Sequence, residues 1–170
     1  MEGRLDAAIL ALPVSEPSLT EVALFAENFL LVRPPEFEGA PVPSSESLRE
    51  MRLLLLEEGH CFRDQALSFC NMQAPREMLD ASSLSTLVQM VGAGMGVTLI
   101  PEMAVGVETR SAAVSLARFA EPQPSRTIGM VWRKTSPLAK QLLHISEIVG
   151  SAAEGLRKQA NVGQGRKRRR

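Results

Sequence analysis

Two cysteines carry the chemistry that this sequence could perform, and they occupy positions 61 and 70. Cys61 follows a short apolar run, Leu53 to Leu56, whose length is typical of a buried strand. Beyond Cys61, apolar residues recur at the i, i+4 and i+7 spacing of a helix, at Phe62, Ala66 and Phe69. Cys61 is therefore predicted to lie where a buried strand has ended and a helix begins.

The start of a helix is a place where a thiol becomes reactive. The first amide groups of a helix are unpaired and carry partial positive charge, which stabilises a thiolate. We therefore expect the pKa of the Cys61 thiol to fall, and Arg63, and His60 when protonated, to act in the same direction. Cys70 continues the apolar line of the helix and is expected to be buried and inert.

Other interpretations of the two cysteines remain open at this point. In a chain without other extracellular signals, cysteines are commonly small buried hydrophobic residues. Along an intact helix their Cα atoms are about 13 Å apart at 1.5 Å per residue, whereas a disulfide needs less than about 7 Å. If the two cysteines pair, the helix must therefore unwind. The C-x8-C spacing matches no common zinc pattern and the chain has only two histidines, so no metal or cofactor is expected.

Composition favours a folded chain without a membrane segment. Hydrophobic residues make up 45% of the 170 residues, and the formal net charge is zero. The body of the chain is therefore not expected to attract nucleic acid by charge. There is no apolar run of membrane length and no signal-peptide pattern, so the cytoplasm is the expected location, where a disulfide is transient or sensing.

Strand and helix patterns alternate along the chain. Strands are predicted over residues 5–12, 21–25, 29–33, 53–56, 97–100, 114–119 and 126–132. Helices are predicted over residues 61–70, 84–93 and 137–156. The glycine-rich run 92–96 follows a helix and precedes a strand, which is the reverse of the order in a nucleotide-binding loop. The alternation predicts an α/β fold with mainly parallel strand pairing.

The run HCFRDQALSFC, residues 60–70, closely resembles the peroxide-sensing segment of the OxyR family of LysR-type transcriptional regulators. In that family the first cysteine is the peroxidatic thiol, and the second resolves it into an intramolecular disulfide. The resemblance implies these two roles for Cys61 and Cys70, with His60, Arg63 and Asp64 in the supporting segment. From residue type alone, Asp64 is an ordinary first-turn carboxylate.

Three other runs resemble LysR-type effector domains: LDAAILALP, SSLSTLVQMVGAGMGVTLIP and RTIGMVWR. The resemblance covers about residues 3 to 157 and implies two α/β lobes of the periplasmic-binding-protein type. Residues 26–125 are expected to form the second lobe, with the redox switch, and residues 1–25 and 126–157 the remaining part of an incomplete first lobe. The basic tail, residues 158–170, is predicted to be disordered.

The same resemblance places three further residues. It implies that Arg126 lies near the thiol pocket and that Ser82 and Ser83 line an effector cleft. Without the resemblance, Arg126 is a surface charge at the end of a strand, and either serine is a helix cap. The two interpretations of the serines are compatible.

A complete regulator of this family also has an N-terminal winged helix-turn-helix, a linker helix and the opening elements of the first lobe. These are not visible in the sequence, which is expected to be a C-terminal piece of such a regulator. DNA contact is then expected only through the missing N-terminal domain. The resemblance also implies a dimer or tetramer of the full-length protein, hydrogen peroxide as the signal, and glutaredoxin or thioredoxin as the reductant.

Three functions compete on these observations. The first is the peroxide-sensing regulatory domain of a transcription activator, which switches by a reversible Cys61–Cys70 disulfide. The second is an effector-binding domain with inert cysteines, or a truncated fragment without function. The third is a thiol enzyme, which is disfavoured because no spacing specifies the paired base and the oxyanion hole of a hydrolase.

Overall fold

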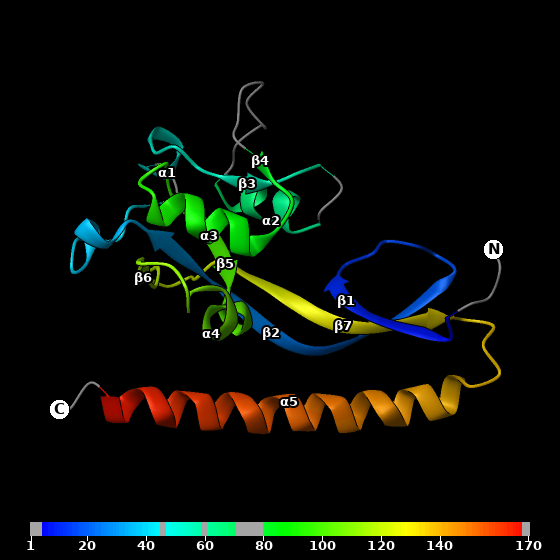
Figure 1. The fold of residues 1–170 in the computed structure, drawn as a ribbon. Helices are drawn as coiled ribbons and strands as arrows, with labels where there is room; N and C mark the ends of the chain where they lie inside the picture. Colours follow the sequence, from blue (N-terminus) through cyan, green and yellow to red (C-terminus); the bar gives the residue numbers. More distant parts are fainter. Residues whose placement is uncertain (1–4, 45–46, 59–60, 71–79, 168–170) are drawn as a thin grey trace. The chain divides into compact units, whose positions relative to one another are not determined.

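The computed structural model describes residues 5–44, 47–58, 61–70 and 80–167 (Figure 1). The chain divides into two compact units. One unit comprises Met1–Ala26 and Arg126–Arg170, and the other comprises Glu27–Ser125. Two long strands, β2 (Leu19–Arg33) and β7 (Ser125–Arg133), contribute residues to both units.

In the first unit, β1 (Ala7–Leu12) pairs with β7 in antiparallel fashion, from Ala7 opposite Trp132 to Leu12 opposite Thr127. Figure 1 shows β1 in blue beside β7 in yellow, and β7 also borders β2. Helix α5 (Ala139–Lys167) contributes to the core of this unit. That core contains Leu24, Met130, Trp132 and Leu142.

Gly129 marks the point where β7 passes between its two neighbours. A Cβ atom at this position would lie 2.2 Å from Cδ1 of Leu12 and 2.8 Å from the carbonyl oxygen of Val22. Both distances are too short for a side chain, so only glycine allows the three strands to approach this closely.

In the second unit, the far half of β2 pairs with two strands that come much later in the chain. It runs antiparallel to β5 (Thr98–Pro101) and to β6 (Ser115–Ala117). Helix α3 (Leu84–Gly92) buries three of its apolar side chains in the core, at Leu87, Val88 and Val91. The described part of this unit also contains four short helical segments: η1 (Pro35–Phe37), α1 (Ser47–Glu50), η2 (Glu102–Ala104) and α4 (Val105–Glu108).

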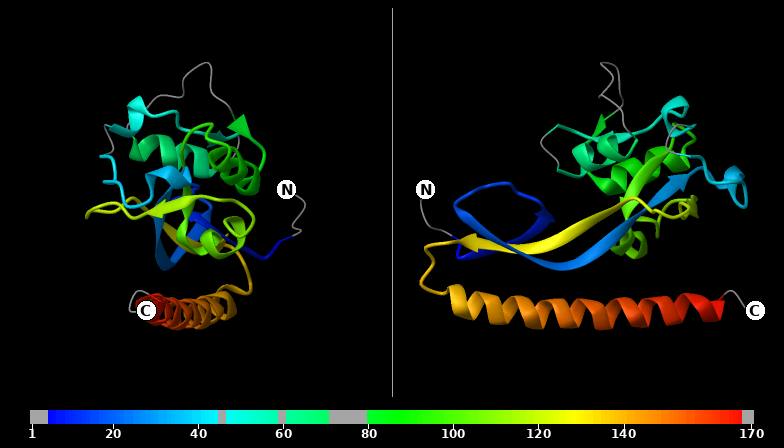
Figure 2. Two further views of the ribbon diagram at one scale, coloured as in Figure 1. Left: turned by 60° about the vertical axis from the view of Figure 1, so that its left-hand side comes forward. Right: turned by 180° about the vertical axis from the view of Figure 1, so that it is seen from behind.

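The second unit also contains one strand–helix–strand unit. Strand β3 (Leu55–Leu56) pairs in parallel with β4 (Asp80–Ala81), and helix α2 (Cys61–Phe69) lies between them in the chain. Figure 2 shows from two further sides that α2 and α3 lie next to this small sheet. The hydroxyl of Thr98 in β5 donates at 2.8 Å to the carbonyl oxygen of Leu54, the residue directly before β3, and so links β5 to the segment that enters the small sheet.

Two predictions about the strands are wrong. Strand β2 is continuous, although the sequence predicted two pieces separated at residues 26–28. Tertiary contacts keep this stretch extended, because the buried Glu27 accepts from the amide of Met103 at 3.0 Å and the amide of Phe29 donates to the carbonyl oxygen of Pro124 at 2.8 Å. The described pairings are also mainly antiparallel, since alternating strand and helix patterns do not decide which distant strands become neighbours.

The apolar run at residues 53–56 is buried as predicted, but only its last two residues form a strand. Leu53 makes an isolated parallel bridge to Val97 instead. At the other end of the chain, the backbone of α5 is helical through Lys167, so the predicted helix extends past residue 156. The predicted disorder of residues 158–170 remains a prediction.

Candidate functional site

Helix α2 begins at Cys61, where the apolar pattern predicted a helix start, and Cys70 directly follows its last residue. His60 and the side chain of Cys61 lie outside the described residues. The expected effects of the helix start, Arg63 and His60 on the thiol therefore remain predictions. The described part of the site is the body of α2 and the surface against which it packs.

Cys70 lies directly after the last turn of α2 and is fully buried, as predicted, with 0% of its surface exposed. Its amide donates to the carbonyl oxygen of Ala66 at 3.2 Å, which continues the helical hydrogen bonding by one residue. It belongs to the core cluster that also contains Phe62 and Ala66. Its inertness toward oxidants stays a prediction, consistent with this burial.

Aromatic contacts hold α2 against the rest of the unit. The rings of Phe62 and Phe29 meet edge to face with their centroids 5.1 Å apart, and those of Phe69 and Phe119 do so at the same distance. Edge-to-face pairs contribute about 0.5–1.5 kcal/mol beyond their buried area. One ring lies near each end of α2, so both ends of the helix are packed.

Arg63, in the first turn of α2, is buried and makes two polar contacts. Its Nη1 donates to the carbonyl oxygen of Leu56 at 2.7 Å and lies 2.8 Å from Oδ2 of Asp80. The side chain of Arg63 is 7% exposed and that of Asp80 is 30% exposed. The guanidinium therefore joins the start of α2 to the end of β3 and the start of β4.

Asp80 is a residue that the sequence did not single out. It lies beyond the connector that follows Cys70. An ion pair between a helix and a strand this far along the chain has no characteristic spacing in the sequence. The pair changes how Arg63 acts on its surroundings, because a nearby carboxylate offsets much of the positive field of a guanidinium. Support of the thiolate by Arg63 remains a prediction.

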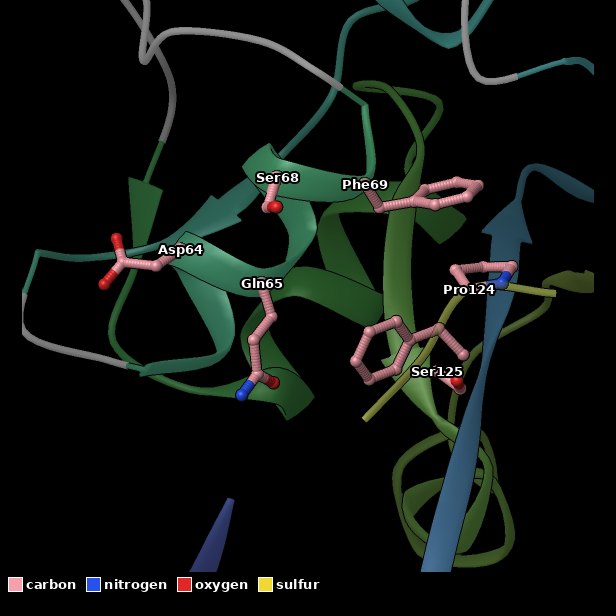
Figure 3. A pocket seen from close by; sticks show the side chains of 7 residues that line it. Asp64, Gln65, Ser68, Phe69, Pro124 and Ser125 are labelled. Carbon is pink, nitrogen blue, oxygen red and sulfur yellow. The ribbon is translucent and has the colours of Figure 1, made fainter. Parts of the chain in front are cut away.

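A hollow of about 380 Å³ opens beside α2. Figure 3 shows Asp64, Gln65, Ser68 and Phe69 extending from α2, with Pro124 and Ser125 on the side of Phe69. Phe29 completes the lining. The Oε1 atom of Gln65 is buried without a hydrogen-bond partner among the described atoms, so it could accept a hydrogen bond from a bound molecule. Asp64 is exposed, as an ordinary first-turn carboxylate would be.

The remaining candidate residues lie apart from α2 in the chain. Ser83 is the N-cap of α3, because its hydroxyl oxygen accepts from the amide of Thr86 at 3.2 Å. Ser82 precedes it and is exposed. Their role in an effector cleft stays a prediction. Arg126 belongs to the first unit, and its predicted place near the thiol pocket also stays a prediction.

Among the described residues, no group of three or more histidine, cysteine, aspartate or glutamate side chains is arranged to hold a metal ion. No helix in the described part of the chain has both the length and the apolar character that a membrane span requires.

Comparison with known proteins places this arrangement in a family. The model of the LysR substrate binding domain matches residues 1–153. The chain belongs to this family. The family is one of transcriptional regulators rather than enzymes.

Curated relatives in this family carry related names. A probable hydrogen peroxide-inducible genes activator of Mycobacterium avium is 42% identical over 154 residues, which cover 88% of this chain and 50% of the relative. The DNA-binding transcriptional dual regulator OxyR of Escherichia coli K12 is 39% identical over 161 residues, with 90% and 52% covered. The chain spans about half the length of the curated relatives it matches.

Solved structures of OxyR proteins share the fold. A variant of Corynebacterium glutamicum OxyR with hydrogen peroxide bound matches with a TM-score of 0.83 and 32% identity, over 95% of this chain and 54% of that one. The reduced regulatory domain of OxyR from Pseudomonas aeruginosa matches with a TM-score of 0.74 and 34% identity, over 89% and 73%. The predicted resemblance to OxyR and the predicted α/β fold of the periplasmic-binding-protein-like LysR effector domain are confirmed.

Proposed function

We propose that this chain is the peroxide-sensing regulatory domain of an OxyR-like, LysR-type transcription activator. It switches by a reversible intramolecular disulfide between Cys61 and Cys70. The observation that carries the proposal is the placement of the two cysteines, with Cys61 at the first residue of α2 and Cys70 in the core at its far end. The names of the relatives support the choice of hydrogen peroxide as the oxidant.

The proposed chemistry has two steps. The thiolate sulfur of Cys61 attacks one oxygen of hydrogen peroxide, the O–O bond breaks, and Cys61 becomes a sulfenic acid. The other oxygen leaves as hydroxide and is protonated to water. The sulfur of Cys70 then attacks the sulfur of Cys61, an S–S bond forms, and the hydroxyl group leaves with the Cys70 proton as a second water. The two electrons that the thiols lose reduce the peroxide.

The second step requires α2 to change its structure. Residues 61 and 70 are separated by a full helix, so their Cα atoms start about 13 Å apart, at 1.5 Å per residue, while a disulfide needs less than about 7 Å. Cys70 must also leave the core in which it is buried. The oxidised chain therefore differs from the reduced one in α2 and its packing, and this structural difference is the response to the oxidant.

Four partners follow from the proposal: DNA, further copies of the protein, a reductant and hydrogen peroxide. The full-length protein binds DNA through a domain outside the part that matches this chain, and it works as a dimer or tetramer whose packing the switch alters. A dithiol protein of the glutaredoxin or thioredoxin class returns the disulfide to thiols by thiol–disulfide exchange. Hydrogen peroxide is the signal rather than a substrate for continuous turnover.

The experiment is to treat the reduced chain with one equivalent of hydrogen peroxide, alkylate the remaining thiols, and map the peptides by mass. We expect one linkage, between the peptides that contain Cys61 and Cys70, and its loss in Cys61→Ser. An effector-binding domain with inert cysteines would give no linkage at stoichiometric peroxide. Sustained peroxide consumption with thioredoxin or glutaredoxin present would instead indicate a thiol peroxidase.

A further inference from the structure

The contacts of Arg63 join helix α2 to the small β3–β4 sheet. We call the group formed by the Arg63 guanidinium, the Leu56 carbonyl oxygen and the Asp80 carboxylate the Arg63 clamp. Leu56 ends β3 and Asp80 begins β4, while Leu55 and Asp80 are partners in the parallel pairing. One side chain of α2 therefore contacts both strands of the small sheet, at the end of β3 and at the start of β4.

The clamp has the properties of a contact that contributes to stability. The Arg63 side chain is only 7% exposed, so its cation is largely removed from water and depends on its two acceptors. A hydrogen bond between charged groups is stronger than one between neutral groups, and loss of one partner leaves a buried charge uncompensated. By contrast, the ion pair between Arg118 and Glu102 in the same unit joins two side chains that are 39% and 27% exposed.

The position of the clamp links it to the proposed switch. Arg63 is two residues after Cys61, and Asp80 lies at the far side of the connector that follows Cys70. The clamp thus holds both ends of the segment that carries the two cysteines. When α2 unwinds to bring the cysteines together, the first turn moves, and Arg63 cannot keep both of its acceptors.

We propose that the Arg63 clamp is a restraint on the redox switch, which stabilises the dithiol form and so sets how oxidising the surroundings must be before the disulfide forms. The proposal rests on the proposed function. The disulfide couple takes up two electrons and two protons to give the two thiols. Because the clamp favours the thiol side of that equilibrium, it makes the midpoint potential less negative.

The test changes Asp80 rather than Arg63, because a change at Arg63 would also alter the charge beside Cys61. Asp80→Asn removes the carboxylate charge at almost the same size, and Asp80→Ser is a second variant; the exposed position of Asp80 leaves the core intact in both. The 170-residue chain is equilibrated in glutathione redox buffers, and the disulfide fraction is read by alkylation and mass. Glu102→Gln, which removes the exposed ion pair, is the matched control.

We expect the equilibrium constant for disulfide formation to rise roughly tenfold in the Asp80 variants, which moves the midpoint about 30 mV more negative. Glu102→Gln should leave the midpoint unchanged. A freed Arg63 that acted only on the Cys61 thiolate would stabilise the reduced form and move the midpoint the other way, which would overturn the restraint. Equal midpoints in all variants would also overturn it. Absence of any disulfide in the unchanged chain would instead overturn the proposed function, and the restraint with it.

Discussion

At the scale of single residues, the two cysteines differ in what surrounds them. Cys61 occupies the first residue of α2, where unpaired amide groups favour a thiolate, whereas Cys70 is surrounded by the apolar core. Burial in an apolar environment opposes ionisation of a thiol. The two thiols are therefore expected to react at very different rates, and the order of events in the proposed switch follows from that difference.

Replacement of Cys70 by serine tests this order. Cys70→Ser should trap the sulfenic acid on Cys61 after one equivalent of peroxide, because the sulfur that would displace the hydroxyl is absent. A dimedone adduct on the Cys61 peptide, measured by mass, reports it. Cys61→Ser is the matched variant and should give no adduct on Cys70. Similar labelling of the two cysteines in the native chain by iodoacetamide would contradict the predicted asymmetry.

A second residue-scale feature is the close approach of Gly96 to a neighbouring backbone. A Cβ atom at position 96 would lie 2.3 Å from the carbonyl oxygen of Arg52 and 3.2 Å from Cγ of Leu54. The first of these neighbours is backbone and cannot move aside alone. This approach allows the amide of Val97 to donate to the same carbonyl oxygen of Arg52 at 2.9 Å.

Gly96→Ala should therefore lower the free energy of unfolding by about 3 kcal/mol, as overpacking does. Gly106→Ala is the control, because a Cβ there has no neighbour within 4 Å and position 106 is helical. Alanine at that position should raise the free energy of unfolding by about 0.5–1 kcal/mol. Urea titration followed by circular dichroism measures both. Equal effects of the two substitutions would show that the backbone of Arg52 does not approach Gly96 this closely.

At the scale of elements, the hydrogen bonds at the start of α3 show which of the two preceding serines caps the helix. Ser83 accepts from the amide of Thr86, and its hydroxyl also lies 2.9 Å from the Thr86 hydroxyl. The amide of Leu87 follows with a bond to the carbonyl oxygen of Ser83 at 3.2 Å. These contacts describe an N-cap at Ser83, and only this serine of the pair makes them.

Ser83→Ala should lower the free energy of unfolding by about 1 kcal/mol through loss of the cap. Ser82→Ala should change it by less than about 0.5 kcal/mol, as expected for an exposed residue without such a contact. Chemical denaturation of the two variants side by side measures the difference. A larger loss of stability in Ser82→Ala than in Ser83→Ala would contradict the assignment of Ser83 as the N-cap.

At the scale of the whole molecule, charge limits what the chain can bind. The formal net charge is zero, and the longest basic run is GRKRRR at residues 165–170. The family match, residues 1–153, is to a substrate binding domain and not to a DNA-reading one. Contacts between phosphates and a basic run release counterions, so they weaken steeply with salt and do not distinguish sequences.

The 170-residue chain should therefore bind DNA weakly, without preference for sequence, and only at low salt. Fluorescence anisotropy with a promoter duplex and a scrambled duplex of equal length measures this over a range of salt concentrations. Deletion of Arg166–Arg170 should abolish the binding, and the full chain at high salt should match the deletion variant. Promoter-specific binding that survives moderate salt would reveal a reading surface within the chain.

Features that depend on neighbours in the chain were accessible from the sequence alone. The apolar spacing after Cys61 predicted where α2 begins, the glycine-rich run predicted the passage from α3 to β5, and the cysteine motif indicated the family. Helical periodicity and helix caps are local, because they arise from hydrogen bonds between residues three or four apart. The cysteine motif is likewise a short contiguous stretch of sequence.

Features that join distant segments were decided only in the folded molecule. β2 is continuous through Glu27 because the amide of Met103 and the carbonyl of Pro124 hold that stretch, and neither contact has a spacing that a sequence shows. The antiparallel direction of most strand pairs and the ion pair between Arg63 and Asp80 arose in the same way. One physical reason explains all three features. Such contacts form only when the fold brings distant segments of the chain together, and the free energy that selects that fold comes from burial of residues far apart in sequence.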